Sequence, residues 1–219
     1  EPTTGRIAGV EALARWDGEE SASHLFQRAR RGGLKERLSR FAQRKALRIA
    51  GAWKAPLSDL KISINLLAED LVREGYDHWL LREIADAGLA PDRVTLEITE
   101  DSLLADGQLA AECLSRLREA GVQIAVDDFG TGYANLAYLT HLPLDTLKID
   151  RGLIADLADA ERGRIVVRAM IGLARELNLK VVVEGVETSE QLALVADWGC
   201  DLYQGFLSSG ALAEQDLAE

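Results

Sequence analysis

Polar side chains stand at the ends of the short apolar runs of this 219-residue sequence, and most of them are carboxylates. They are Glu11, Asn65, Glu97, Glu100, Asp127, Asp128, Lys148, Asp150, Glu184 and Gln204. Burying such carboxylates together costs roughly several kcal/mol per ion unless a cation compensates them. Oxygen ligands without cysteine or a strand-end histidine select Mg²⁺, Mn²⁺ or Ca²⁺ over zinc. The pattern indicates a metal site, provided that the fold gathers these strand ends.

The adjacent pair Asp127 and Asp128 is the most specific of these features, and it precedes the glycine-bracketed residues 130–132. Neighbouring side chains on a strand point to opposite faces. If the loop turns Asp128 inward, the pair could serve two cations about 3.5–4 Å apart, which can hold a phosphodiester and an attacking hydroxide. Lys148 and Arg15 are the cations that could stabilise the transition-state charge. Taken alone, the pair could instead cap a turn or a helix.

The elements that would position these residues are strands alternating with amphipathic helices. Strands are expected at residues 7–15, 61–65, 94–99, 123–127, 146–150, 180–184 and 201–206. Runs such as KVVVEGV are continuously apolar, as in strands that are covered on both faces. Alternating strands and helices predict a parallel sheet, either open or closed, and seven strands in this length favour a barrel. A barrel would bring the carboxyl ends of the strands to one face.

Bulk composition excludes several other classes. The chain is 47% hydrophobic with a net charge of −11, which is an ordinary globular composition and argues against a basic nucleic-acid surface. No apolar run reaches the ~18 residues of a membrane span. Cys113 and Cys200 have no metal-ligand spacing and are interpreted as buried, reduced thiols of a cytoplasmic protein. The three histidines are assigned no ligand role: His24, His78 and His141.

A series of short motifs resembles one known family. They are VEALARW (10–16), SINLL (63–67), LEITED (96–101), DDFGTGYANLAYL (127–139), LKIDR (147–151), VVEGVET (182–188) and QGF (204–206). The motifs run in family order across nearly the whole chain and resemble the EAL domain, the bacterial phosphodiesterase module for cyclic di-GMP. The resemblance implies a modified TIM (β/α)8-type barrel with one antiparallel strand. It also implies hydrolysis of cyclic di-GMP to linear pGpG by a water that two Mg²⁺ or Mn²⁺ ions activate.

The resemblance assigns roles by motif position. The implied metal ligands are Glu11, Asn65, Glu97, Asp127, Asp128 and Glu184. Glu184 is also a candidate general base, and Lys148 would orient the attacking water. The implied substrate contacts are Leu13, Arg15, Asp150, Glu187 and Gln204. Glu100 would anchor the loop 130–135, which in this family contributes to a homodimer contact. Ca²⁺ is expected to occupy the site but to inhibit turnover, because its looser coordination aligns the nucleophile poorly.

Two departures from the family pattern concern the start of the chain. The family's first strand, with its YQP-like motif, is absent, and DGEESASHLFQRARRGGL replaces the FIP…AE segment. Residues 1–219 are therefore interpreted as one EAL domain, an N-terminally truncated fragment of a longer protein with sensory or diguanylate-cyclase domains. That protein is expected to be cytoplasmic, or to be anchored to a membrane with this part in the cytoplasm. The fragment itself is expected to contact neither membrane nor nucleic acid.

Two other functions are compatible with parts of the pattern. A catalytically silent EAL module would only bind cyclic di-GMP or a partner protein, and an unrelated barrel such as an enolase-type lyase would share only the carboxylates. Silent members usually lack metal ligands or loop acids, all of which are present here. The sequence therefore favours an active phosphodiesterase.

Overall fold

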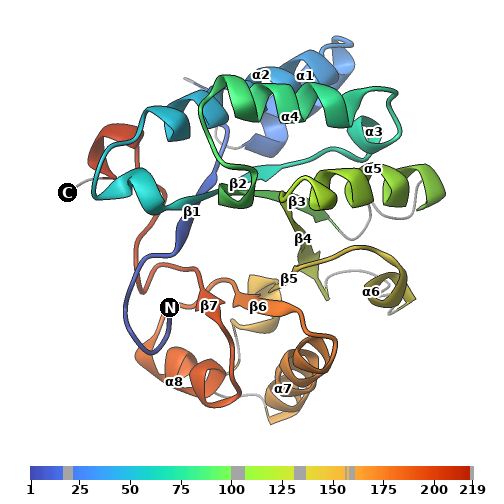
Figure 1. The fold of residues 1–219 in the computed structure, drawn as a ribbon. Coiled ribbons are helices and arrows are strands. Elements are labelled where there is room, and N and C mark those ends of the chain that lie inside the picture. The colour runs from blue at the N-terminus through green and yellow to red at the C-terminus, as the bar shows by residue number, and fades with distance from the viewer. Residues whose placement is uncertain (17–21, 100–106, 131–136, 156, 158–160, 218–219) are drawn as a thin grey trace. The chain divides into compact units, whose positions relative to one another are not determined.

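The computed structural model describes residues 1–16, 22–99, 107–130, 137–155, 157 and 161–217. The chain divides into two compact units (Figure 1). The N-terminal unit comprises Gly9–Glu97 and Asp106–Gln123, and the C-terminal unit comprises Glu1–Ala8, Ile98–Ala105 and Ile124–Glu219. In both units strands alternate with helices, as the sequence predicts.

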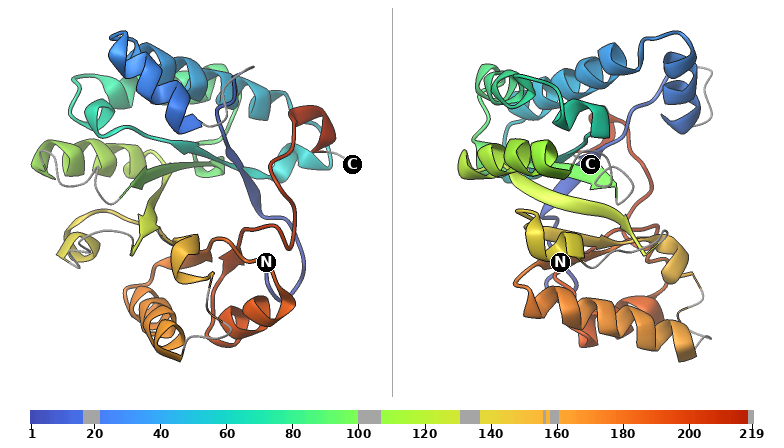
Figure 2. Two further views of the ribbon diagram at one scale, coloured as in Figure 1. Left: turned by 180° about the vertical axis from the view of Figure 1, so that it is seen from behind. Right: turned by 90° about the vertical axis from the view of Figure 1, so that its right-hand side faces the viewer.

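The N-terminal unit is built on the parallel strands β1 (Gly9–Ala12), β2 (Lys61–Asn65) and β3 (Val94–Thr99). Its helices are α1 (Ala22–Arg31), α2 (Lys35–Ala52), α3 (Ala68–Leu71), α4 (Tyr76–Asp86) and α5 (Gly107–Glu119), with 3-10 turns η1 (Leu57–Asp59) and η2 (Pro91–Arg93). Figures 1 and 2 show α2 and α4 side by side on one side of these strands.

The C-terminal unit contains the parallel strands β4 (Gln123–Phe129), β5 (Thr146–Ile149), β6 (Lys180–Val183) and β7 (Leu202–Tyr203). Its helices are α6 (Ala137–His141), α7 (Glu161–Glu176) and α8 (Ser189–Asp197), with 3-10 turns η4 (Arg151–Leu153) and η5 (Glu214–Asp216). Figure 2 shows α7 and α8 on the same side of β5 to β7.

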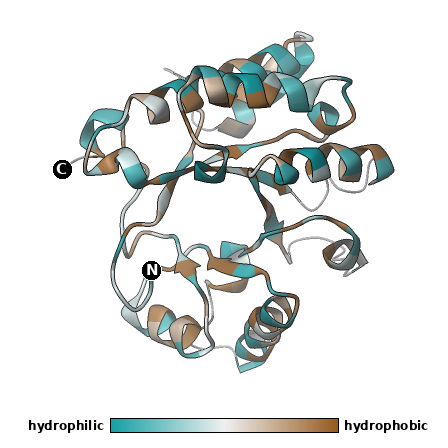
Figure 3. Cartoon of the chain, viewed as in Figure 1, coloured by the Kyte–Doolittle hydropathy of each residue, from teal (hydrophilic) through white to brown (hydrophobic). Residues whose placement is uncertain are grey.

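Each unit has an apolar core between its strands and helices. In the N-terminal unit, Ile64 and Leu96 of the strands and Leu80 of α4 are almost completely buried. In the C-terminal unit, Leu147 and Val183 are buried, as is Ile171 of α7. Figure 3 shows mainly hydrophobic strands and helices that carry both kinds of residue. Strands covered on both faces explain why the sequence runs are continuously apolar.

Charged side chains fix the register at the amino ends of several strands. Asp145, just before β5, accepts the N–H of Ile124 through Oδ2 at 3.0 Å. Asp201, just before β7, accepts the N–H of Val181 in the same way at 2.8 Å. Each of these acids therefore extends the hydrogen bonding of its strand by one further bond to the neighbouring strand.

The predicted parallel α/β fold is confirmed, with two strands at the predicted boundaries, β2 and β3. Strand β1 is shorter than the predicted 7–15, because its pairing with β2 spans only Gly9 to Ala12. The pairings with a described register are all parallel, so the antiparallel strand stays a prediction. None of the described helices combines the length and apolar composition that crossing a membrane requires.

Candidate metal centre

A β-bulge places Asp127 and Asp128 together at the end of β4. Val126 pairs with Leu147 and Phe129 pairs with Ile149, so the two acids between them oppose the single residue Lys148. The backbone of Asp128 is left-handed, with φ of 55°. A bulge interrupts the alternation of side chains along a strand. The bulge within β4, and not the loop that follows it as the sequence analysis expected, therefore turns Asp128 inward beside Asp127.

Three carboxylates meet at this bulge. One oxygen each of Asp127, Asp128 and Glu184 lies within 4.8 Å of the other two. Glu184 follows β6 directly, and its N–H donates to the carbonyl of Ile149 at 3.0 Å. The carboxyl ends of β4 and β6, the two parallel strands that flank β5, therefore bring together acids from distant parts of the sequence, as predicted.

Lys148 lies between two of these acids, Asp127 and Glu184, and is only 3% exposed. Its Nζ lies 3.0 Å from Oδ1 of Asp127 and 2.7 Å from Oε1 of Glu184. A buried ammonium is costly to desolvate unless carboxylates compensate it closely. The carboxylates of Asp127 and Glu184 therefore compensate the buried charge of Lys148, and its ammonium lies between them.

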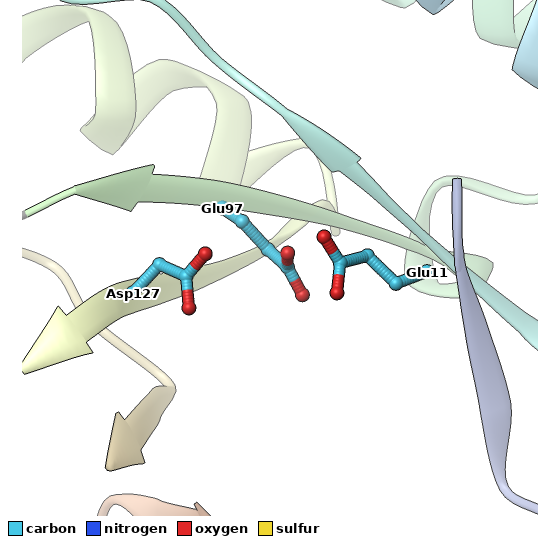
Figure 4. A group of neighbouring side chains, drawn as sticks. All are labelled: Glu11, Glu97 and Asp127. Carbon is cyan, nitrogen blue, oxygen red and sulfur yellow. The ribbon is translucent and has the colours of Figure 1, made fainter. Parts of the chain in front are cut away.

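The N-terminal unit holds a second polar group at the ends of its strands. Asn65 at the end of β2 donates from Nδ2 to Oε1 of Glu11 on β1 at 3.0 Å. One carboxylate oxygen of Glu11 lies within 4.8 Å of one of Glu97 on β3, which is 3% exposed. Figure 4 shows the carboxylates of Glu11 and Glu97 pointing toward one another, and it also draws Asp127 of β4. Because Nδ2 of Asn65 donates to Glu11, its Oδ1 is the atom suited to a cation.

The donor chemistry of both groups fits a hard divalent cation. All the side chains in them that could ligate a metal offer oxygen. Carboxylates that approach one another in a buried site repel unless a positive charge lies between them. Mg²⁺, Mn²⁺ and Ca²⁺ bind such oxygen sets, whereas zinc prefers nitrogen and sulfur.

The structure places the expected substrate residues as follows. Leu13 and Arg15 follow β1 and are exposed, and the guanidinium of Arg15 donates to the carbonyl of Ala14 at 3.0 Å. Asp150 caps η4 by accepting the N–H of Gly152 at 2.7 Å. Glu187 lies on the surface of the loop after β6. The fifth expected residue, Gln204, is discussed with its loop below.

The loops after β6 and β7 are joined by main-chain hydrogen bonds. Gln204 donates its N–H to the carbonyl of Val183 at 2.9 Å, and its own carbonyl accepts from Val186 at 3.1 Å. The exposed side chains of Glu187 and Gln204 therefore stand on neighbouring loops of the C-terminal unit. Glu100 and the loop residues 131–135 lie outside the described residues.

Sequence reasoning missed Gln191, a buried residue of α8. Its Oε1 accepts the N–H groups of Glu187 and Thr188 at 2.8 and 3.1 Å, and its Nε2 donates to the carbonyl of Ile154 at 3.1 Å. The spacing from Thr188 to Gln191 is that of a capping box, which predicts the bond from the N–H of Thr188 but not the one from Glu187. The third bond joins the loop of Glu187 to the turn that Asp150 caps, and no local pattern indicates it.

Parallel strands with oxygen-donor side chains at their ends define an α/β protein with a candidate site for divalent cations. The sequence model of the EAL domain matches residues 1–211. NbdA of Pseudomonas aeruginosa, named a cyclic di-GMP phosphodiesterase, is 38% identical over 98% of this chain and 28% of its own length. The chain belongs to the EAL family. It spans less than two fifths of the length of the curated relatives that it matches.

Solved structures of this family share the fold. The phosphodiesterase MucR of Pseudomonas aeruginosa, in complex with cyclic di-GMP, has a TM-score of 0.87 and 36% identity, covering 96% of this chain and 87% of that one. BlrP1 of Klebsiella pneumoniae, in a manganese and cyclic di-GMP complex, has a TM-score of 0.84 and 32% identity, covering 94% of this chain and 52% of that one. The TIM-like α/β fold that the resemblance implied is therefore confirmed.

Proposed function

We propose that this chain is a metal-dependent phosphodiesterase that hydrolyses cyclic di-GMP to linear pGpG. The observation that carries the proposal is the bulge at Asp127 and Asp128, which gathers two consecutive acids and Glu184 around the buried Lys148. The names of the relatives support the substrate, since NbdA is named a cyclic di-GMP phosphodiesterase and MucR has been solved with cyclic di-GMP.

Two divalent cations would be held by the carboxylates and the amide that stand at the strand ends. Glu11, Asn65 and Glu97 would hold one cation, and Asp128 and Glu184 would hold the other. Asp127 would be a ligand of both cations. Bound Mg²⁺ or Mn²⁺ would supply Lewis acidity to the attacking water and neutralise charge on the phosphodiester.

The chain's own residues would position the substrate and move the proton. Glu184 would accept the proton of the attacking water, and Lys148, 2.7 Å from it, would orient that water and stabilise the developing negative charge. Arg15 and the main chain at Leu13 would meet the phosphate and sugar. Asp150, Glu187 and Gln204 would complete the pocket, and the cap that Asp150 forms with Gly152 limits its freedom to reorient.

Context beyond this chain is also part of the proposal. We propose that residues 1–219 form one EAL domain of a longer cytoplasmic or membrane-anchored protein. The name of MucR, a bifunctional diguanylate cyclase and phosphodiesterase, supports such an arrangement. We also propose that the chain forms a homodimer, and that Glu100 anchors the loop 130–135, which contributes to the dimer contact.

The test is an incubation of the chain with cyclic di-GMP and Mg²⁺ or Mn²⁺, with pGpG measured by chromatography. Asp128→Asn removes one charge from the bulge and should reduce turnover by at least 100-fold. Asp201→Asn is the matched control, because it makes the same change at the opposite end of a strand and keeps an acceptor for Val181.

Three results would contradict parts of the proposal. If cyclic di-GMP binds tightly and stays intact, the chain is a receptor instead of an enzyme. If it neither binds nor is cleaved, the substrate assignment is wrong. If Asp128→Asn cleaves as fast as Asp201→Asn, the bulge is not the catalytic centre.

A further inference from the structure

A buried polar cluster lies beneath the end of β2 in the N-terminal unit. It consists of Ser39 and Gln43 on α2, Asp70 on α3 and Tyr76 on α4, each at most 3% exposed. Polar groups are costly to bury unless they are hydrogen-bonded. We refer to these four residues as the Gln43 cluster.

The hydrogen bonds of the Gln43 cluster have a fixed direction. Ser39 donates its hydroxyl to Oδ2 of Asp70 at 2.9 Å, and its oxygen accepts from Nε2 of Gln43 at 3.2 Å. Tyr76 donates its hydroxyl to Oε1 of Gln43 at 3.0 Å. These neighbours orient the Gln43 amide with its nitrogen on one side and its oxygen on the other.

The remaining bond of the Gln43 amide leaves the cluster and reaches Asn65. Nε2 of Gln43 donates to the main-chain carbonyl of Asn65 at 3.0 Å. An amide with the reverse orientation would set two acceptor oxygens against each other at this contact. The cluster therefore presents a single, oriented donor to the last residue of β2.

The main chain of Asn65 is thus held on both sides of its peptide unit. The following residue, Leu66, donates its N–H to the carbonyl of Glu97 on β3 at 2.9 Å. Gln43 holds the Asn65 carbonyl from α2, so that this peptide has both of its polar groups satisfied. From this position the side chain of Asn65 donates to Glu11 at 3.0 Å.

We propose that Gln43 is a positioning residue for Asn65, which it holds so that the Asn65 amide points to Glu11. The inference rests on the proposed function, because it takes Asn65 as a ligand of a divalent cation. Hydrogen bonds behind a ligand fix its orientation, and their loss typically weakens metal binding by about 10–100-fold. Gln43 acts through the Asn65 main chain and touches neither cation nor substrate.

The experiment titrates Mn²⁺ into the chain and follows free Mn²⁺ by electron paramagnetic resonance, without substrate. Gln43→Met keeps the length of the side chain and removes its polar groups. Gln43→Glu keeps an acceptor for Tyr76 and replaces the nitrogen that donates to both Asn65 and Ser39. Both variants should bind one Mn²⁺ about 10-fold more weakly, while a second ion at Asp128 and Glu184 binds as in the wild type.

Tyr76→Phe is the matched control. It removes a hydrogen bond of the same cluster but leaves the bond from Gln43 to Asn65 in place. It should lower the melting temperature, as the Gln43 variants do, with its Mn²⁺ affinity within about twofold of the wild type. This split separates a positioning role from a loss of stability that any cluster residue would cause.

Each result decides the question. The inference is wrong if both Gln43 variants bind Mn²⁺ as tightly as the wild type, or if Tyr76→Phe weakens binding as much as they do. In either case the wild type can still cleave cyclic di-GMP, so these results would not contradict the proposed function. If the wild-type chain binds no Mn²⁺, both the proposed function and this inference are wrong.

Discussion

The ammonium of Lys148 lies 2.7 Å from the carboxylate of Glu184, and the two residues stand at the ends of neighbouring parallel strands. The same ammonium lies 3.0 Å from Asp127 on the other side. Lys148 is therefore a cation between acids that would otherwise face one another in a buried site. Its removal and the addition of a divalent cation should have opposite effects on stability.

Replacing Lys148 with methionine tests this arrangement. Removing one partner of a buried ion pair typically costs about 3–5 kcal/mol, because the remaining charge has lost its compensation. We expect a loss of this size for Lys148→Met in EDTA, measured by urea unfolding. Mn²⁺ at a hundredfold excess over its Kd should restore about 2.7 kcal/mol, since it binds the folded state.

The comparison for this prediction is Lys180→Met on β6, where the side chain is exposed. It should change stability by less than about 0.5 kcal/mol, as surface substitutions usually do. Equal stability of Lys148→Met and the wild type in EDTA would show that the acids do not need the ammonium.

The left-handed backbone of Asp128 predicts a difference between two further substitutions. At φ of 55° a residue with a Cβ is disfavoured by about 1–2 kcal/mol, whereas glycine is not. Asp128→Ala should therefore be less stable than Asp128→Gly by about 1 kcal/mol in urea unfolding. Both should lose Mn²⁺ affinity and turnover, because both lack the carboxylate. If alanine is as stable as glycine here, the strand is not bulged as described.

Much of the fold and the acidic site could be predicted from the sequence, because buried parallel strands give continuous apolar runs. Strand β2 ends at Asn65, where the sequence places it, and the polar residue at that end is local information. The bulge at Asp128 could not be predicted, because it depends on the pairing with β5. A run of consecutive residues gives no sign of a register shift in the partner strand.

Gln43 shows more clearly that a contact set by tertiary packing cannot be predicted from the sequence. In the sequence it is one polar residue of an amphipathic helix, where solvent exposure is the ordinary expectation. Its partners lie between 4 and 33 positions away, on its own helix and on two other elements, β2 and α4. Only the packing of α2 against α4 and the end of β2 makes it a buried donor.

A pH dependence is expected from Asp77 on α4, which is 4% exposed. Burial alone would raise the pKa of Asp77, but hydrogen bonds from Arg116 and His78 outweigh it and lower the pKa to about 2. In the unfolded chain an aspartate has a pKa of about 3.9. The folded state therefore gains stability from Asp77 above about pH 4, and this gain is lost as the pH falls toward 2.

Urea unfolding between pH 2.5 and 7 checks this dependence. Asp77→Asn should be less stable than the wild type by about 2 kcal/mol at pH 7, since hydrogen bonds to charged groups contribute about 1.5–3 kcal/mol. The difference should shrink as the pH is lowered from 4 to 2.5. Parallel stability curves for the two proteins over this range would contradict the role of Asp77.

Asp201 should stabilise the register of β7 through geometry, with little contribution from its charge. Its Oδ2 accepts the N–H of Val181 at 2.8 Å while its own N–H donates to the Val181 carbonyl at 3.0 Å. Asp201→Ala leaves that N–H without its acceptor and should cost about 1 kcal/mol, whereas Asp201→Asn retains an acceptor and should cost less than half as much. Urea unfolding at pH 7 measures both, and hydrogen exchange at Val181 should quicken only in the alanine variant. Equal losses in the two variants would show that the charge of Asp201, not its hydrogen bond, stabilises this end of the strand.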